Sequence, residues 1–247
     1  MAELRAESLG GGITVFVSDA HGFGTDAVLL ARFAAPSAHA VCCDLGSGCG
    51  VIPLLWCKQP TGALTAVELQ PDAAAQICRA VEVNHLHDRL TVRCADLRAL
   101  HGLLPAGGFD LVTMNPPYYA AGTGCLSAEE ADQLARHETV CTPQDLCAAA
   151  ARLLKFGGRF CVCIRPERLT DYLCAMRAHA LEPKRLRPVA KNPARAPWLL
   201  LLEGRRGGKP GLRMEPTLFV HAADGTYTEE MKQIYGDYLL EHRRETL

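Results

Sequence analysis

A strand, a glycine-rich turn and a helix follow one another between residues 40 and 57, and this succession constrains the fold most. The apolar run ends at Asp44, and an apolar stretch of helical length follows the turn. The turn carries a glycine at every second position: Gly46, Gly48 and Gly50. Glycines allow a tight turn and let a ligand approach the backbone closely. The spacing differs from the G-x-G-x-x-G of dinucleotide sites, and a glycine-rich turn alone is also common as a structural loop.

Three further apolar runs predict buried strands that alternate with helices. They cover residues 64–68, 90–96 and 109–114, and the first two end in the carboxylates Glu68 and Asp96. Strands that alternate with helices indicate an α/β fold with a parallel sheet. In open sheets of this kind the ligand lies at the carboxyl ends of the strands. We therefore expect the acidic residues at these strand ends to line one ligand site.

The chain after residue 141 continues the same pattern. Thr142 and Pro143 predict the start of a helix that runs to about residue 154, before two glycines. A strand at 159–164 and a helix at 166–178 follow. Residues 186–190 and 198–203 are expected to form an antiparallel hairpin at the sheet edge. We expect one domain over 13–247, preceded by a mobile segment at 1–12.

Asn115-Pro116-Pro117-Tyr118 directly follows the predicted strand at 109–114. The prolines fix the backbone and leave carbonyl groups free to accept hydrogen bonds. The amide oxygen of Asn115 and the carbonyl of Pro116 suit the two hydrogens of a substrate amino group, while Tyr118 stacks on a planar ring. The tetrapeptide therefore predicts a site for a planar substrate that carries an NH2 group.

Together these motifs resemble the Rossmann-like S-adenosylmethionine-dependent methyltransferases of the NPPY type. Within them, the chain looks like the bacterial tRNA1(Val) (adenine-N6)-methyltransferase family. Five further segments carry the narrower resemblance: 23–30, 135–138, 165–169, 184–187 and 235–236. The resemblance implies a class I methyltransferase fold, with a seven-stranded, mostly parallel sheet flanked by helices in a single domain.

The resemblance also assigns roles to individual residues. The implied cofactor site consists of Thr25, Asp44, Gly46, Gly48, Gly50, Glu68, Leu69, Asp96, Leu97 and Asn115. In the family, the Asp44 position holds the methionine part of the cofactor, the Glu68 position the ribose hydroxyls and the Asp96 position the adenine amino group. The implied catalytic residues are Asn115, Pro116, Pro117 and Tyr118. The implied substrate contacts are Tyr118, Tyr119, Arg165, Lys184, Arg185 and Arg187, and no metal is expected.

Some of these assignments have structural alternatives. Thr25 and its neighbour Asp26 suit a helix N-cap as well as a cofactor pocket. Tyr119 suits packing as well as stacking on a base. Residues 120–133, rich in small side chains, suggest a lid that orders on substrate binding.

The implied reaction is N6-methylation of an adenine in tRNA, next to the anticodon of valine tRNA. The same tetrapeptide also serves enzymes that methylate a glutamine amide of a translation factor, or guanine N2 in ribosomal RNA. A fourth interpretation, an RNA-binding module that has lost catalysis, is disfavoured by the intact tetrapeptide.

Charge is distributed unevenly along the chain. Residues 152–213 contain 15 lysines and arginines against four acids, a net +11, whereas the remainder carries −12. A basic part of this kind predicts a polyanion substrate, although an ordinary solvated surface is the alternative.

Composition also bears on location and assembly. The 12 cysteines fall mostly in apolar segments, as expected for buried thiols in a reducing compartment. The chain has no apolar run of transmembrane length and no apolar signal core near Met1. We therefore expect a cytoplasmic protein that does not contact membranes, with a monomer as the favoured state.

Overall fold

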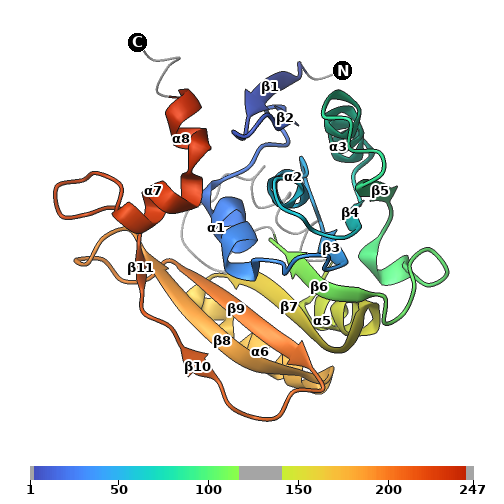
Figure 1. The fold of residues 1–247 in the computed structure, drawn as a ribbon. Coiled ribbons are helices and arrows are strands. Elements are labelled where there is room, and N and C mark those ends of the chain that lie inside the picture. Colours follow the sequence, from blue (N-terminus) through green and yellow to red (C-terminus); the bar gives the residue numbers. More distant parts are fainter. Residues whose placement is uncertain (1–2, 117–140, 243–247) are drawn as a thin grey trace, which may run out of the picture.

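A mixed sheet forms the centre of the fold in the computed structural model, which describes residues 3–116 and 141–242 (Figure 1). The order of its strands is β10-β8-β9-β7-β6-β3-β4-β5, and β11 also pairs with β8. Their bounds are β3 (Cys42–Leu45), β4 (Leu64–Glu68), β5 (Leu90–Cys94), β6 (Phe109–Met114), β7 (Leu154–Ile164), β8 (Leu181–Ala190), β9 (Leu199–Arg206), β10 (Arg213–Met214) and β11 (Leu218–Phe219).

The strands from β5 to β7 are parallel, and β9 runs antiparallel to both β7 and β8. This arrangement confirms the predicted mostly parallel sheet and its terminal hairpin. The sheet has nine strands rather than seven, because the short strands β10 and β11 add to β8. Each of these contains two residues, which is too short for a hydrophobic pattern to be visible in the sequence.

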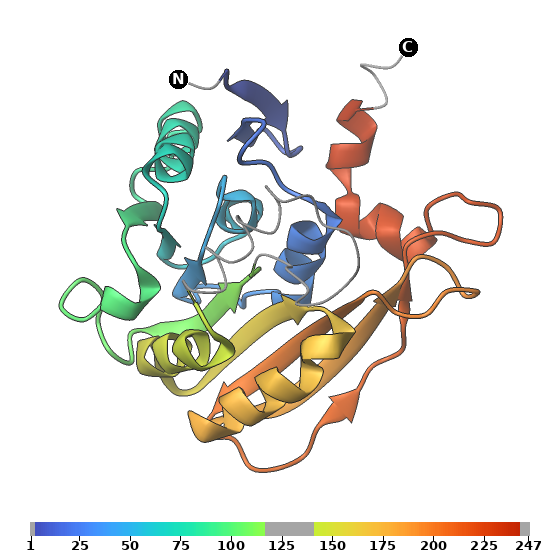
Figure 2. The same ribbon diagram turned by 180° about the vertical axis from the view of Figure 1, so that it is seen from behind.

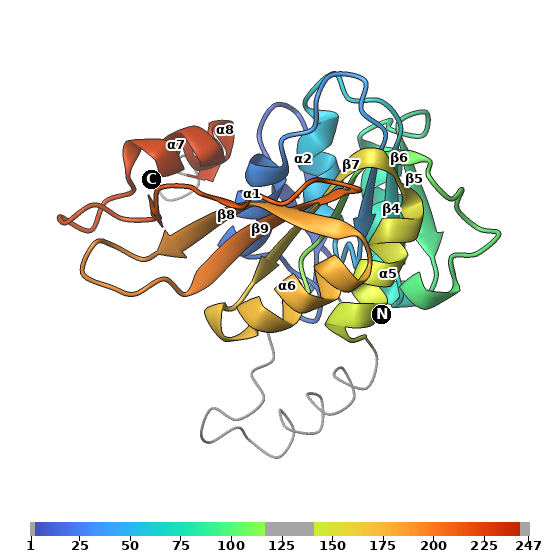
Figure 3. The same ribbon diagram turned by 90° about the horizontal axis from the view of Figure 1, so that it is seen from below.

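Helices cover both faces of the sheet. Their bounds are α1 (Thr25–Ala34), α2 (Val51–Cys57), α3 (Pro71–Val83), α5 (Pro143–Leu153), α6 (Leu169–Ala178), α7 (Glu229–Tyr235) and α8 (Asp237–His242), with short 3-10 turns η1 (Leu97–Ala99) and η2 (Pro166–Arg168). Buried side chains of α1, α2, α3 and α7 form one core with the sheet, and those of α5 and α6 form the other. Figure 2 shows α5 and α6 in front of the sheet, and Figure 3 shows the sheet between the two helical layers.

Burial on both faces explains why the central strands β3, β4 and β6 are apolar at most positions. Cys42 and Cys43 are neighbours in β3, yet they belong to different cores. The described cysteines are all free thiols, and burial raises the pKa of several of them, including that of Cys42 to about 12. Of the described helices, none combines the length and the apolar character that a membrane crossing requires.

Two strands near the N-terminus were not predicted. β1 (Arg5–Ser8) and β2 (Thr14–Val17) form a separate antiparallel pair in which Arg5 lies opposite Val17. Asn84, at the end of α3, fastens β2 through its side chain, which accepts a hydrogen bond from the Thr14 amide and donates one to the Thr14 carbonyl. The expected mobile segment at 1–12 thus contains a strand with a regular partner.

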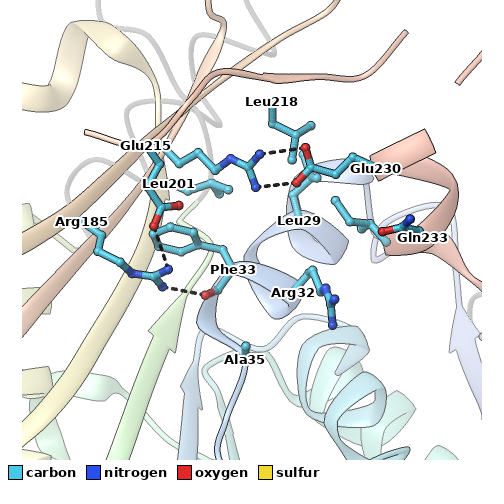
Figure 4. Close-up of a pocket in the computed structure, with 12 residues that line it drawn as sticks. Leu29, Arg32, Phe33, Ala35, Arg185, Leu201, Glu215, Leu218, Glu230 and Gln233 are labelled. Carbon is cyan, nitrogen blue, oxygen red and sulfur yellow. Dashed lines mark hydrogen bonds and ion pairs between the residues drawn. The ribbon is translucent and has the colours of Figure 1, made fainter. Parts of the chain in front are cut away.

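Arg185 links α1 to the antiparallel part of the sheet (Figure 4). Its guanidinium contacts the carboxylates of Glu203 at 2.8 Å and Glu215 at 3.2 Å. It also donates to the carbonyl of Phe33 at 2.9 Å and lies over the Phe33 ring. Arg185, Phe33 and Glu215 border a hollow of about 370 Å³ between α1, β8, β9 and α7. The contacts make Arg185 a structural residue of this corner.

Replacing Arg185 by methionine should therefore destabilise the fold far more than replacing Arg213 by methionine. Arg185→Met leaves the buried carboxylate of Glu203 with a longer contact to Arg159, at 3.3 Å. We expect a loss of roughly 2–4 kcal/mol in unfolding free energy, somewhat below the value for a fully buried pair. The side chain of Arg213 is 71% exposed where it pairs with Glu215, so Arg213→Met should cost under about 1 kcal/mol. Urea unfolding of both variants measures the difference, and equal losses would contradict the structural role.

Candidate functional site

The glycine turn after β3 has the backbone geometry that the sequence predicts. Gly46, Gly48 and Gly50 all have positive φ, at 63°, 56° and 82°. Residues with a side chain rarely adopt this conformation. A Cβ at Gly50 would also lie 3.0 Å from the side chain of Ile77 in α3. The turn therefore requires glycine, and it leaves backbone at the carboxyl edge of the sheet open to a ligand.

Asp44 lies at the base of this turn and is 1% exposed. One carboxylate oxygen accepts from the hydroxyl of Ser47 and the other from that of Thr113, both at 2.6 Å. Burial raises the pKa of Asp44 to about 7, although the two hydroxyl hydrogen bonds oppose the rise; the nearby Glu68 charge adds to it. A buried carboxylate with this pKa is suited to a cationic ligand group, which would favour its charged form.

Glu68 connects the end of β4 to the glycine turn. Its two carboxylate oxygens accept backbone hydrogen bonds from Gly48 at 2.8 Å and from Gln70 at 2.9 Å. The residue is 6% exposed. Each carboxylate oxygen has a second lone pair, so Glu68 is able to accept from a pair of hydroxyl groups while it holds the turn.

Asp96 follows β5 and caps the turn η1. Its carboxylate accepts from the backbone amide and from the guanidinium of Arg98, which holds the pKa of Asp96 below its usual value. Leu69 is 45% exposed and Leu97 is partly buried. This end of the site thus combines apolar side chains with a carboxylate, as a flat heterocycle with an amino group requires.

The three carboxylates fit the expected cofactor as a set. Asp44, Glu68 and Asp96 stand at or just after the ends of β3, β4 and β5, which are consecutive neighbours in the sheet. Neighbouring strands lie about 4.8 Å apart, so the set extends along the edge in the direction of an elongated ligand. The ligand group that each carboxylate suits changes in the same order: a cation at Asp44, hydroxyl groups at Glu68 and a heterocycle at Asp96.

Asn115 directly follows β6, which lies between β7 and β3 in the sheet. Its amide nitrogen donates to the carboxylate of Asp26 at 3.0 Å, and its amide oxygen accepts from the thiol of Cys163 at 2.9 Å. Pro116 is partly buried beside it. Pro117, Tyr118, Tyr119 and the expected lid at 120–133 lie outside the described residues.

The start of α1 decides against one of the two alternatives for Thr25 and Asp26, a helix N-cap. Gly24 is the N-cap, and no side chain caps the helix, so the N-cap interpretation of Thr25 and Asp26 is wrong. The hydroxyl of Thr25 instead forms a hydrogen bond with that of Tyr235 at 2.7 Å. The side chains of Thr25 and Asp26 thus both bond to distant segments, Thr25 to Tyr235 in α7 and Asp26 to Asn115 after β6.

The expected substrate contacts are not all brought together. Arg165, directly after β7, is exposed and lies against Trp198. Arg185 in β8 lies opposite Glu203 in β9. Glu203 in turn lies opposite Cys161 in β7, two residues before Cys163. Carboxylates bind the guanidinium groups of Arg185 and Arg187. Glu203 pairs with Arg185. Glu215 also pairs with Arg185, and Glu230 lies 2.7 Å from Arg187 (Figure 4).

Lys184 donates to the carbonyl of Lys209. The roles of Arg165, Lys184, Arg185 and Arg187 toward a substrate stay predictions. Arg185 and Arg187 also pair with carboxylates inside the fold, a structural role that the sequence did not reveal and that is the alternative to substrate binding.

Two basic residues that the sequence did not single out lie at the carboxyl edge of the sheet. Lys191 and Arg195 belong to the connection between β8 and β9, and both are exposed. Within the described residues neither side chain has a hydrogen-bond or ion-pair partner. Among residues 3–116 and 141–242, no cluster of histidine, cysteine, aspartate and glutamate side chains is suited to hold a metal ion. The proline-rich composition of 191–197 predicted a linker, but nothing in it distinguished these charges from the other thirteen of the basic part.

Comparisons with known proteins agree with this geometry. The chain is 32% identical over 213 residues to the tRNA1(Val) (adenine(37)-N6)-methyltransferase of Shigella dysenteriae serotype 1, with 83% of each chain covered. The protein of the same name from Escherichia coli O157:H7 matches to the same extent.

Solved structures and a family model extend the comparison. A predicted O-methyltransferase from Agrobacterium tumefaciens has a TM-score of 0.70 at 20% identity, covering 87% of this chain and 97% of that one. A 16S rRNA N2 methyltransferase from T. Thermophilus, solved with AdoMet and guanosine, has a TM-score of 0.54 at 18% identity, covering 85% and 46%. At these identities the likeness concerns the fold. The family described as "Methyltransferase small domain" matches residues 11–176, and the chain belongs to this family.

Proposed function

We propose that the protein transfers a methyl group from S-adenosylmethionine to N6 of an adenine in tRNA, next to the anticodon of valine tRNA. The observation that carries the proposal is the position of Asn115, at the end of β6 and beside the strand that bears the glycine turn. An amide acceptor there lies at the same edge of the sheet as the expected cofactor residues. The names of the relatives supply the RNA and the base.

The cofactor is held by residues of three strand ends. Asp44 and the glycine turn receive the methionine part, Glu68 the ribose hydroxyls, and Asp96 with Leu69 and Leu97 the adenine. When bound, S-adenosylmethionine supplies a methyl group that is already activated for transfer. Thr25 contributes through its position at the start of α1, where its hydroxyl contacts Tyr235.

Asn115 and Pro116 position the nucleophile. The nitrogen of an adenine amino group is a weak nucleophile because its lone pair is delocalised into the ring. Accepting both of its hydrogens, by the Asn115 amide oxygen and the Pro116 carbonyl, favours a pyramidal nitrogen and stabilises the positive charge that develops on it. As the C–S bond to the methyl group breaks and the N–C bond forms, the nitrogen loses one of its protons to water or to a backbone acceptor. Holding the nitrogen in line is worth about 7–11 kcal/mol for well-oriented reactants. Pro117 stiffens this segment, and Tyr118 with Tyr119 is proposed to stack on the extruded base.

The RNA is proposed to contact basic residues at the catalytic edge. Arg165 remains a candidate because it directly follows β7 and is exposed. We add Lys191 and Arg195, whose side chains are exposed in the β8–β9 connection. The wider assignments, a methyltransferase domain over 13–247, a substrate-binding part over 152–213 and a lid over 120–133, are part of the same proposal.

The proposal predicts that purified protein transfers label from radiolabelled S-adenosylmethionine into N6-methyladenosine of tRNA. Asn115→Ala should lower kcat by at least ~100-fold, because an acceptor for the developing charge is removed. Cofactor affinity should stay within a few-fold, since that binding depends on Asp44 and Glu68. Nucleoside analysis of total RNA from a strain that lacks the gene measures the product.

The labelled product also separates the alternatives. Label in N2-methylguanosine, or in a protein band after lysate is added, would replace adenine by guanine or by a glutamine amide as the target. Full activity of Asn115→Ala would refute the amino-acceptor mechanism itself.

Cofactor affinity should depend on pH through Asp44. Because the free protein holds this carboxyl with a pKa of about 7, binding a cationic group below that pH must expel a proton. Affinity should fall about tenfold per pH unit below 7. The stability of the free protein should follow the opposite trend: a folded pKa raised above the unfolded value adds stability at low pH, and this is lost as pH rises from about 4 to 7. Calorimetry and thermal unfolding test both trends, and Asp44→Asn should abolish them; identical pH profiles for the two proteins would contradict the assignment.

Removing Lys191 and Arg195 should weaken RNA binding and lower its salt dependence. The slope of log affinity against log salt should fall by about 0.7 for each phosphate that the variant no longer neutralises. The matched control is Lys209→Ala with Arg213→Ala, which removes the same charge from the segment that leads into β10. Titration of labelled tRNA at several salt concentrations measures both double variants. If the control weakens binding as much as Lys191→Ala with Arg195→Ala, binding reflects net charge and not this edge.

A further inference from the structure

We infer that Asp26 is a positioning residue that fixes the orientation of the Asn115 amide. The inference rests on the proposed function, in which the oxygen of that amide accepts a hydrogen of the substrate. It concerns a residue of α1 that lies 89 positions from Asn115 in the sequence. The resemblance placed Asp26 only near the cofactor pocket, and the alternative, a helix N-cap, is not observed.

The amide of Asn115 is held at both ends. Its nitrogen donates to a carboxylate oxygen of Asp26 at 3.0 Å, and its oxygen accepts from the thiol of Cys163 at 2.9 Å. Cys163 is fully buried in β7 and Asp26 is partly buried. One contact comes from helix α1 and the other from the neighbouring strand β7.

The chemistry of these partners fixes which end of the amide faces which way. A carboxylate only accepts hydrogen bonds, whereas an asparagine amide has a donor end and an acceptor end. Asp26 therefore faces the NH2 group, and the amide oxygen turns toward β7. A flipped amide would set oxygen against the carboxylate and would offer an NH2 group to a substrate that itself brings an NH2 group.

The same contact strengthens the acceptor. Hydrogen bonds to a charged partner are roughly twice as strong as neutral ones. Donation from the amide nitrogen to a carboxylate polarises the amide and increases the negative charge on its oxygen. The amide oxygen has two lone pairs, and the Cys163 thiol donates to it. Asp26 thus acts through Asn115 and does not need to touch the substrate.

The start of α1 is built to place this carboxylate. A Cβ at Gly24 would lie 2.6 Å from the other carboxylate oxygen of Asp26, so glycine leaves the room that the side chain occupies. Thr25 fixes the same turn through its hydrogen bond to Tyr235 in α7. The first turn of a helix also favours a negative charge. Three local features therefore converge on one position of the Asp26 side chain.

The test combines a spectrum of the free protein with kinetics. In the free protein, the NH2 resonances of Asn115, identified by their disappearance in Asn115→Ala, report its hydrogen bond. Asp26→Ala should shift them strongly, and Asp26→Asn, which retains a neutral acceptor, should shift them less. With cofactor and tRNA saturating, kcat should fall ~10- to 100-fold for Asp26→Ala, with a smaller loss for Asp26→Asn. The KM for tRNA and the affinity for S-adenosylmethionine should change less than about threefold.

Asp72→Ala is the matched control, because Asp72 also lies in the first turn of a helix that starts one residue earlier, α3. It should leave the Asn115 resonances and kcat unchanged. Unshifted Asn115 resonances in Asp26→Ala would overturn the inference, as would a wild-type kcat in that variant or equal losses for the alanine and asparagine variants. If the wild-type protein methylated no RNA, the spectrum would still test the Asp26–Asn115 contact. Failure of the proposed function can therefore be distinguished from failure of this inference.

Discussion

The burial of the parallel strands on both faces is the constraint on which the rest of the structure depends. With helices on each side, a strand such as β3 has no solvent-facing position along its length, and polar side chains gather where the strands end. Asp44, Glu68 and Asn115 all stand at such ends. The site is therefore a product of the sheet architecture, since strand order decides which of these groups become neighbours.

Within the site, backbone geometry and electrostatics support each other. The glycine turn exposes amide groups, and Glu68 takes one of them, that of Gly48, to join the ends of β3 and β4. Asp44 is buried between two hydroxyls, where its charged form is costly. Both carboxylates hold the turn in place through ordinary internal contacts, and both keep lone pairs for a ligand. The same residues thus serve the fold and the proposed binding site.

The elements that depend on local pattern were predictable from the sequence. Pro71 and the Thr142–Pro143 pair mark the starts of α3 and α5, and the strands β4 and β6 have the predicted bounds. Contacts between distant segments were not predictable in this way. A count of charges could not distinguish Arg185, which meets carboxylates from two other segments, from Lys191, which meets none in the described residues. Likewise, no spacing rule relates Asp26 to Asn115, because their contact depends on how α1 packs at the end of β6.

The hydrogen bond between Thr25 and Tyr235 joins the first helix of the sheet domain to the segment that follows its last strand. Tyr235 also contacts Tyr227 edge to face and stacks on Tyr238, so an aromatic cluster connects α7 and α8 to the start of α1. The C-terminal helices thereby support the start of α1, although they contribute no residue to the expected cofactor site. A chain shortened before α7 would retain every strand of the central sheet, yet it would lack the Tyr235 hydroxyl that bonds Thr25 at the start of the helix that carries Asp26. Tags or partner domains are consequently better joined beyond α8 than substituted for it.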